Sequence, residues 1–120
     1  MADANDPANT LSVRDTIGYY QRVVAKLGQA QADKGVELFL APGVGHCYGG
    51  TGPDQVDLLA AMDRWVESGT APSRQSLVHE KRDAAGKVLA SRPLCRYPAY
   101  AKHDGKGAPE DAKSFACAMP

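Results

Sequence analysis

The stretch that decides the fold is residues 35–52, which read GVELFLAPGVGHCYGGTG. Its first six residues are mainly apolar and end at Ala41-Pro42-Gly43, a pattern that predicts a buried strand over residues 35–40. A glycine-rich loop follows and carries His46 and Cys47. In open α/β sheets, reactive side chains lie on loops just past the carboxyl ends of strands. The stretch therefore predicts a strand that presents His46 at the edge of a sheet.

A helix is predicted on the N-terminal side of this strand, over residues 13–27. Its apolar side chains, which fall on one face of a 3.6-residue period, are Ile17, Tyr20, Val24 and Leu27. Ser12 is a suitable N-cap and Gly28 a suitable C-cap. Residues 29–34 are polar, so they are predicted to be mobile or to form a frayed extension of the helix.

A second helix is predicted on the C-terminal side of the loop, over residues 55–68. Asp54 follows Pro53 and can cap this helix, and Gly69 closes it. Trp65 is assigned to the core because it shares helical spacing with other apolar side chains. The apolar face comprises Val56, Leu59, Met62, Trp65 and Val66.

The last third of the chain has a different pattern. Residues 76–83 and 87–92 predict two strands of a hairpin that turns at Ala84-Ala85-Gly86. Residues 93–120 lack periodicity, apart from a short helix predicted near residues 110–115. The order of helix, strand, His loop and helix is typical of the closing section of an open α/β sheet.

Composition limits both the class of protein and its partners. The 120 residues are 43% hydrophobic and 23% charged, which predicts a globular chain. The net charge is zero and no basic block occurs, which argues against nucleic-acid binding. No apolar run reaches the length of about 18 residues that spans a membrane, and the polar start of the chain lacks the apolar segment of a signal peptide. Glycine and proline are frequent, with 12 and 8 residues, so the chain is expected to depend on disulfides or on a larger protein.

Neither the histidines nor the cysteines have metal-site spacing. The chain has three of each without a C-x-x-C or H-x-x-x-H pattern, so no metal site is expected. His79 lies among charged residues of a predicted strand and is expected to be exposed, and His103 is expected to be an inert loop residue. The odd cysteine count leaves two interpretations open. An exported protein would have one thiol whose partner is missing, and a cytosolic protein would hold three unrelated buried cysteines.

The order of acidic residues and His46 matches an α/β-hydrolase triad, in which serine, acid and histidine follow one another along the chain. Asp3 or Asp6 would precede the first helix at the end of a neighbouring strand, and His46 follows the next strand. Imidazole can take a proton from serine because its pKa lies near neutrality, and a carboxylate behind it fixes its tautomer. A single histidine in a glycine-rich loop is also typical of a surface turn, so this order alone does not establish catalysis.

Several short motifs occur in a specific order along the chain. Residues 42–53 read P-G-x-x-H-C-x-G-G-x-G-P, and residues 65–72 read W-V-E-x-G-x-A-P. Residues 92–98 read R-P-L-C-x-Y-P, and residues 114–117 read S-F-x-C. Upstream, residues 15–20 read D-T-x-x-Y-Y. Together, these motifs resemble those of the tannase/feruloyl esterase family, and the resemblance covers nearly the whole chain.

The resemblance implies roles for individual residues. His46 would be the triad base. Cys47 would pair with a cysteine that precedes the catalytic serine, outside this chain. Cys95 and Cys117 would form a second disulfide that closes the tail.

The triad acid stays open between two carboxylates. Met1-Ala2-Asp3-Ala4 fits the end of the family pattern H-G-M-[SA]-D-A, which favours Asp3. Asp6-Pro7 fits a D-P variant of that pattern and has the nearer spacing to Asp15-Thr16. Either choice requires an insertion relative to the family.

The resemblance also implies the wider architecture and activity. Residues 1–120 would be the C-terminal portion of an α/β-hydrolase catalytic domain, with a helix, strand, His loop, helix, hairpin and disulfide-tied tail. No G-x-S-x-G motif occurs, so the nucleophile, the oxyanion hole and the lid, with any family calcium site, would lie outside this chain, and no cofactor is implied. The parent enzyme would be a secreted or periplasmic serine esterase that hydrolyses esters of aromatic acids. This chain alone would be inactive, either as a fragment or as a truncated gene that begins at an internal methionine.

Two other functions stay open at this stage. A small secreted binding domain could keep the disulfide-tied scaffold with no need for His46 beside an acid. A redox role for Cys47 would need a basic neighbour to activate the thiol, and the loop has no Lys or Arg near it. The discriminating observation is whether His46 lies within hydrogen-bond reach of Asp3 or Asp6.

Overall fold

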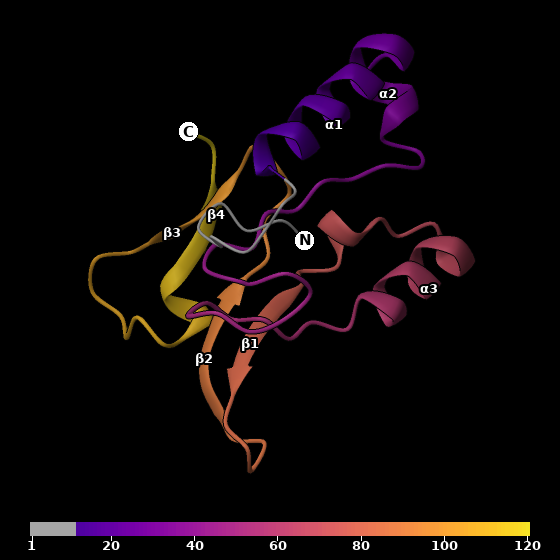
Figure 1. Cartoon of the computed structure of the whole chain (residues 1–120). Coiled ribbons are helices and arrows are strands. Elements are labelled where there is room, and N and C mark those ends of the chain that lie inside the picture. Colours follow the sequence, from indigo (N-terminus) through magenta and orange to yellow (C-terminus); the bar gives the residue numbers. More distant parts are fainter. Residues whose placement is uncertain (1–11) are drawn as a thin grey trace.

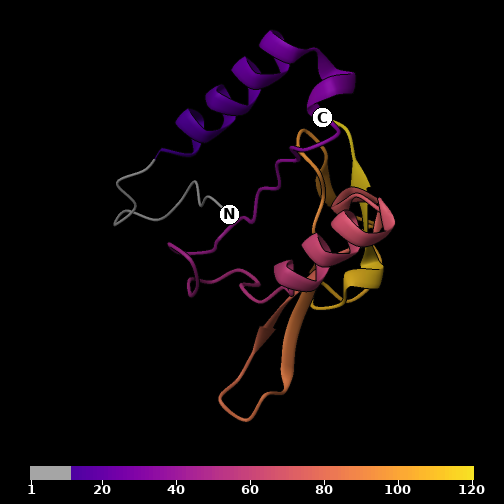
Figure 2. The same cartoon turned by 90° about the vertical axis from the view of Figure 1, so that its right-hand side faces the viewer.

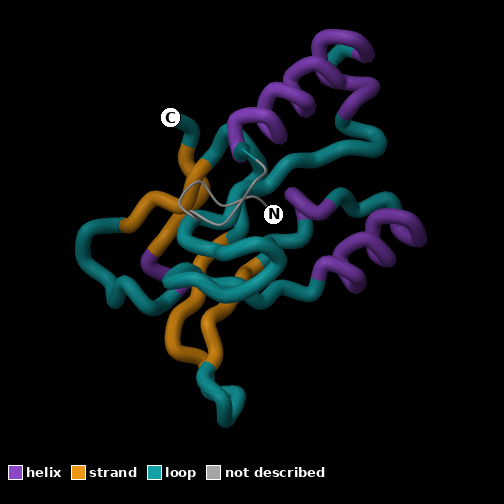
Figure 3. Tube along the Cα trace, in the orientation of Figure 1, coloured by secondary structure: helices purple, strands orange, loops and turns teal. Residues whose placement is uncertain are grey.

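The computed structural model describes residues 12–120, in which short helices and strands surround a long irregular segment. In chain order, the elements are α1 (Val13–Leu27), α2 (Gln29–Ala32), α3 (Leu58–Ser68), η1 (Pro72–Arg74), β1 (Val78–Arg82), β2 (Val88–Pro93), β3 (Tyr100–His103), η2 (Ala112–Ser114) and β4 (Phe115–Ala118). Figure 1 shows α1 and α2 at one end of the molecule, the β1–β2 hairpin at the opposite end and α3 to one side. Between α2 and α3 the chain is almost wholly loop, and this loop carries His46 (Figure 3).

The first helix begins and ends where the sequence predicts. The Ser12 side chain accepts a hydrogen bond from a first-turn amide at 3.2 Å, and the Gly28 amide bonds back into the last turn at 2.8 Å. Of the two alternatives for residues 29–34, the helical extension is the one that the structure favours. Residues 29–32 form α2, in which the amide of Ala32 bonds to the Gly28 carbonyl at 3.0 Å and the Ala32 side chain is buried.

The predicted strand over residues 35–40 is extended, but it is not part of a regular sheet. Within residues 12–120, Phe39 makes only an isolated bridge with Arg96, and the Tyr97 amide donates to the Leu38 carbonyl at 2.8 Å. A ladder needs a neighbouring strand of matching length, and the segment at residues 96–97 offers only this short contact. The strand prediction is therefore wrong as a regular element, although the half-buried apolar run is correctly located.

The second predicted helix begins later than the sequence indicates. Helix α3 starts at Leu58 and is capped by Asp57, whose carboxylate accepts from the Ala60 amide at 2.9 Å. The prediction that Asp54 caps a helix from residue 55 is wrong, because Gln55 is held in an isolated bridge with Glu80 of β1. That extended pairing prevents residue 55 from entering a helix.

The apolar face of α3 is exposed rather than packed into the core. Leu59 and Val66 are 82% and 80% exposed, and Met62 is 48% exposed. Trp65 is half-buried, so its assignment to the core is wrong in this chain. Here Trp65 lines a groove of about 330 Å³ that runs between α3 and residues 37–39. The helix is amphipathic as predicted, but nothing in the described part of the chain covers much of its apolar face.

The predicted hairpin is confirmed. Strands β1 and β2 pair antiparallel, from Val78 opposite Pro93 to Arg82 opposite Val88, with a register shift at Arg82. Asp83 holds the turn, since its carboxylate accepts from the Ala85 and Lys87 amides at 2.9 Å each.

The tail contains a second small sheet that the sequence pattern did not reveal. Strands β3 and β4 pair antiparallel, with Ala101 opposite Cys117. The helix predicted near residues 110–115 is the single 3₁₀ turn η2, which leads directly into β4. Residues on the two strands alternate only weakly between apolar and polar types, which hid their period.

Several contacts attach this tail to the hairpin. Cys95, just after β2, forms a disulfide with Cys117 of β4, which is the pairing that the family resemblance implies. The guanidinium of Arg92 lies 4.0 Å from the centre of the Phe115 ring. The Ser91 amide donates to the Glu110 carbonyl at 2.8 Å.

The described core is small. Buried Ala41, Val44 and Leu94 form its centre, and the partly buried side chains around them are Phe39, Val56 and Leu77. The radius of gyration is 14.9 Å, against about 13.6 Å for a compact domain of this length. Figure 2 shows why, because α1 and the hairpin tip extend away from each other. Among residues 12–120, no helix is long and apolar enough to cross a bilayer.

Replacing both Cys95 and Cys117 with alanine should lower the free energy of unfolding by about 3 kcal/mol, because the closed loop restricts the unfolded chain. Urea denaturation monitored by circular dichroism measures this loss. Cys47→Ala is the matched control, since it removes an exposed thiol outside the disulfide, and it should change stability by less than about 0.5 kcal/mol. Equal effects of the two changes would contradict the assignment.

Candidate active site

The loop that carries His46 is closed by backbone pairing. The Gly45 amide donates to the Gly49 carbonyl at 3.0 Å, and the Gly52 amide donates to the Gly43 carbonyl at 2.8 Å. These bonds leave residues 46–48 at the tip of a narrow turn. The loop is thus a small folded unit rather than a flexible connection.

Two glycines are required because the two sides of this loop touch. A Cβ on Gly50 would lie 2.2 Å from the Gly43 carbonyl oxygen, and Gly50 has a φ of 85°. A Cβ on Gly52 would lie 2.1 Å from the Pro42 carbonyl oxygen. Neither distance is compatible with a side chain, so the G-G-x-G part of the motif has a steric cause.

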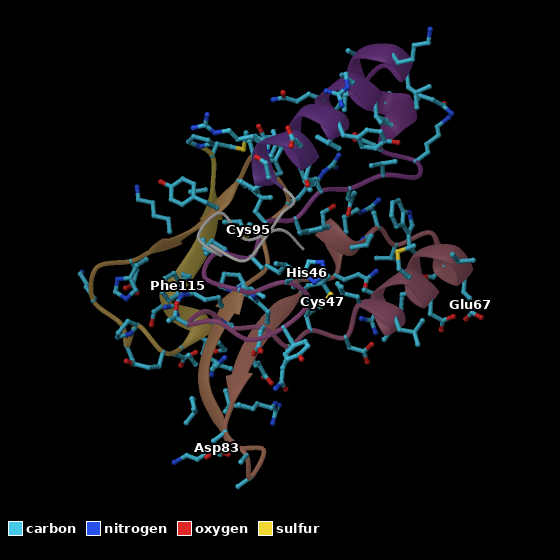
Figure 4. All side chains as sticks on the ribbon, in the orientation of Figure 1. His46, Cys47, Glu67, Asp83, Cys95 and Phe115 are labelled. Atoms are coloured by element: carbon cyan, nitrogen blue, oxygen red, sulfur yellow. A yellow bond between two sulfur atoms is a disulfide. The ribbon has the colours of Figure 1, made fainter. Side chains whose placement is uncertain are left out.

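His46 and Cys47 are neighbours at the exposed tip of the turn. Figure 4 shows both side chains on the loop that joins α2 to α3. The Cys47 sulfur lies 3.4 Å from Nδ1 of His46, and Cys47 has a φ of 70°, in the left-handed region. Both residues are exposed. The two candidate acids, Asp3 and Asp6, lie outside the described residues, so their relation to His46 stays a prediction.

Two charged residues outside the tip hold the far side of the turn. Asp54 accepts a hydrogen bond from the Gly49 amide at 2.7 Å. The ammonium of Lys81 donates to the Gly50 carbonyl at 2.9 Å and lies 3.7 Å from the other oxygen of Asp54. Neither role could be predicted from the sequence, because Asp54 was expected to cap a helix and Lys81 lies 31 residues from its partner in the loop.

The prediction that His79 is exposed is wrong, since only 3% of its surface is accessible. Its strand β1 lies against residues 53–55, and Nδ1 of His79 donates to the Pro53 carbonyl at 2.9 Å. The carbonyl can only accept, so Nδ1 carries the proton. The burial lowers the pKa of His79 below its ordinary value of 6.5, and the charge of Arg92 lowers it further, whereas the bond to Pro53 opposes both effects.

A buried carboxylate anchors the segment upstream of the loop. The side chain of Glu37 is only 2% exposed, accepts from the Ser73 amide at 2.9 Å and lies 3.4 Å from the guanidinium of Arg96. Arg96 also pairs with Asp33, and hydrogen bonds from Gln29 and Arg96 lower the pKa of the Asp33 carboxyl. The sequence contained a usable signal, because a single carboxylate inside an apolar run needs a partner when it is buried.

In the part of the chain that the structure describes, no group of three His, Cys, Asp or Glu side chains lies close enough together to hold a metal ion. His103 lies on β3, where Nε2 contacts the Gly107 carbonyl at 2.9 Å and the ring packs edge-on against Phe115. These contacts give His103 a structural role in the tail. Of the three histidines, His46 lies at an exposed loop tip, whereas His79 is buried and His103 is held in the tail.

Nearly the whole chain matches one known protein family. The model of the family described as "Tannase and feruloyl esterase" matches residues 2–118. The chain belongs to this family. It spans about a fifth of the length of its curated relatives, so the family match concerns one segment of those proteins.

Two curated relatives illustrate the extent of the sequence match. Over 120 residues the chain is 39% identical to mono(2-hydroxyethyl) terephthalate hydrolase of Piscinibacter sakaiensis, covering 100% of this chain and 19% of that protein. It is 34% identical over 123 residues to feruloyl esterase B of Aspergillus niger, covering 89% of this chain and 23% of that protein.

Solved structures match the arrangement of helices and strands. The crystal structure of feruloyl esterase B from Aspergillus oryzae superposes with a TM-score of 0.80 at 25% identity, over 97% of this chain and 25% of that one. An esterase from the same organism gives a TM-score of 0.79 at 26% identity, over 97% and 26%. The mixed helix and strand structure thus matches part of feruloyl esterase B.

Gly50→Ala should destabilise the chain more than Gly49→Ala, because both glycines have positive φ but only Gly50 would clash. Gly49, with a φ of 81°, has no atom within 4 Å of a built Cβ. The backbone strain at Gly49 should cost about 1–2 kcal/mol, and the clash at Gly50 about 1–3 kcal/mol more. Urea denaturation of both variants measures the difference. Equal losses would show that the loop relaxes around the new methyl group.

The free energy of unfolding should fall as the pH drops below about 6.5, in part because of His79. The folded state keeps this ring neutral, and the unfolded chain takes up the proton at the ordinary pKa of 6.5. The stabilisation is therefore complete above that pH and is lost as the pH falls toward the lower folded pKa. His79→Asn keeps a donor near Nδ1 and does not titrate, so its stability should vary less between pH 7.5 and 5 than that of the original chain. Denaturation curves at these two pH values test this, and parallel losses in both proteins would contradict it.

Proposed function

We propose that this chain supplies the histidine segment of a serine carboxylic ester hydrolase, with His46 as the general base. The observation that carries the proposal is the closed glycine turn, which presents His46 at an exposed tip within a motif of the tannase and feruloyl esterase family. A base must be accessible to the group from which it takes a proton and held in a defined place. The turn meets both requirements.

In this mechanism, a serine outside this chain attacks the ester carbonyl while His46 takes the serine proton. His46 then gives that proton to the leaving alcohol, and water repeats the sequence to release the acid. Asp3, or Asp6 as the alternative, is proposed as the carboxylate that orients the imidazole. Backbone amides near the serine would bind the oxyanion, and they too lie outside this chain.

We propose that the remainder of the parent enzyme is the partner of this chain, which is then the C-terminal portion of an α/β-hydrolase catalytic domain. The exposed apolar face of α3 supports this, because Leu59 and Val66 are each at least 80% exposed. Cys47 supports it as well, since its exposed thiol at the tip of the turn is accessible to a cysteine near the nucleophile.

The proposed substrates are esters of aromatic acids. The support is the names of the relatives, which include feruloyl esterases and a terephthalate monoester hydrolase. We also propose an exported location, because the disulfide between Cys95 and Cys117 persists in oxidising compartments.

The test is a chimera in which this chain replaces the matching quarter of feruloyl esterase B from Aspergillus oryzae. Hydrolysis of methyl ferulate and methyl gallate is measured for the chimera and for its variants. His46→Gln should lower kcat by at least about 10³-fold. His103→Gln is the matched control and should leave kcat within about twofold, because that ring lies in the tail sheet.

The 120-residue chain by itself should hydrolyse neither ester in a manner that depends on His46. His46-dependent turnover by the chain alone would place the nucleophile within these residues and overturn the account of the missing serine. An active chimera in which His46→Gln changes nothing would remove His46 from the mechanism and favour a binding role for the scaffold.

A further inference from the structure

The turn that carries His46 is tied in two separate ways. Inside the loop, backbone bonds join Gly45 to Gly49 and Gly43 to Gly52. Two side chains also bind the backbone of the turn, and they come from different parts of the chain. Asp54 lies at the end of the loop itself, and Lys81 lies on β1.

The external ties form one charged unit. Asp54 is 11% exposed, and one of its oxygens accepts from the Gly49 amide at 2.7 Å. Within residues 12–120 its other oxygen, Oδ1, is buried without a hydrogen bond. Lys81 supplies the countercharge 3.7 Å from that oxygen and donates to the Gly50 carbonyl at 2.9 Å. Bonds in which one partner is ionised are stronger than neutral bonds, so the pair holds both peptide groups at the Gly49–Gly50 corner.

This corner is three residues from His46, across the turn closed by the bond between Gly45 and Gly49. The bond between Gly45 and Gly49 links this corner to the residue that directly precedes His46, so the tip of the turn moves with the corner. A shift of the corner is therefore transmitted to the imidazole. A misplacement of about 1 Å at a catalytic group can cost about 100-fold in rate.

We infer that Asp54 and Lys81 are positioning residues for His46, which act through the Gly49–Gly50 corner and touch no substrate. The inference rests on the proposed function in so far as His46 is the base. In this role the β1–β2 hairpin supports the loop through Lys81 of β1.

The first test measures amide hydrogen exchange by NMR on the 120-residue chain, so it does not depend on ester hydrolysis. Asp54→Ala should speed exchange at the Gly49 amide at least about tenfold, and Lys81→Met should have a smaller effect in the same direction. Asp54→Asn should restore most of the protection, because the amide oxygen can still accept. Asp63→Ala and Lys102→Met, at exposed positions on α3 and β3, should leave Gly49 unchanged. Unchanged exchange in Asp54→Ala would overturn the inference.

The second test uses the active chimera with methyl ferulate. Asp54→Ala should lower kcat about 10- to 100-fold with little change in KM, and Asp54→Asn should recover part of the loss. Faster Gly49 exchange together with an unchanged kcat would overturn the positioning role. A chimera without activity would instead count against the proposed function, and the exchange measurement would still decide whether the charged pair holds the turn.

Discussion

The attachment of residues 53–55 to the edge of β1 is the interaction on which the rest of the structure depends. Glu80 exchanges backbone hydrogen bonds with Gln55 at 2.8 and 3.0 Å and also accepts from the Asp54 amide at 3.1 Å. This pairing places the Pro53 carbonyl over His79 and turns the Asp54 side chain back toward the loop. It also delays the start of α3 by three residues. The hairpin therefore supports the loop that carries His46.

Elements with local signals could be predicted from the sequence, and elements that need a distant partner could not. Helix α1 has its caps and its period within 17 residues, and the hairpin has a turn that Asp83 stabilises from within. Residues 35–40 have the composition of a buried strand, but strand structure requires a neighbour, and the described chain provides only an isolated bridge. Asp54 and Asp57 are equally suitable caps by sequence, and only the pairing with β1 decides between them.

The same distinction between local signals and distant partners applies to the residues of the candidate site. The motif located His46 and Cys47 because their loop is specified by glycines that are close in sequence. The burial of His79 and the contact of Lys81 with the loop could not be predicted, because their partners lie 26 and 31 residues away. His79 lies among charged residues in the sequence, and nothing local shows which face of a two-stranded hairpin is covered.

The dependence of the loop on β1 has a consequence for the order of folding. Synthesis proceeds from the N-terminus, so His46 is made well before His79 and Lys81. The backbone bonds within the turn can form early. The contact of Lys81 with Gly50 and the bond from His79 to Pro53 can form only after the hairpin has been synthesised. The loop that carries His46 therefore completes its contacts with the hairpin only after the final third of the chain has been synthesised.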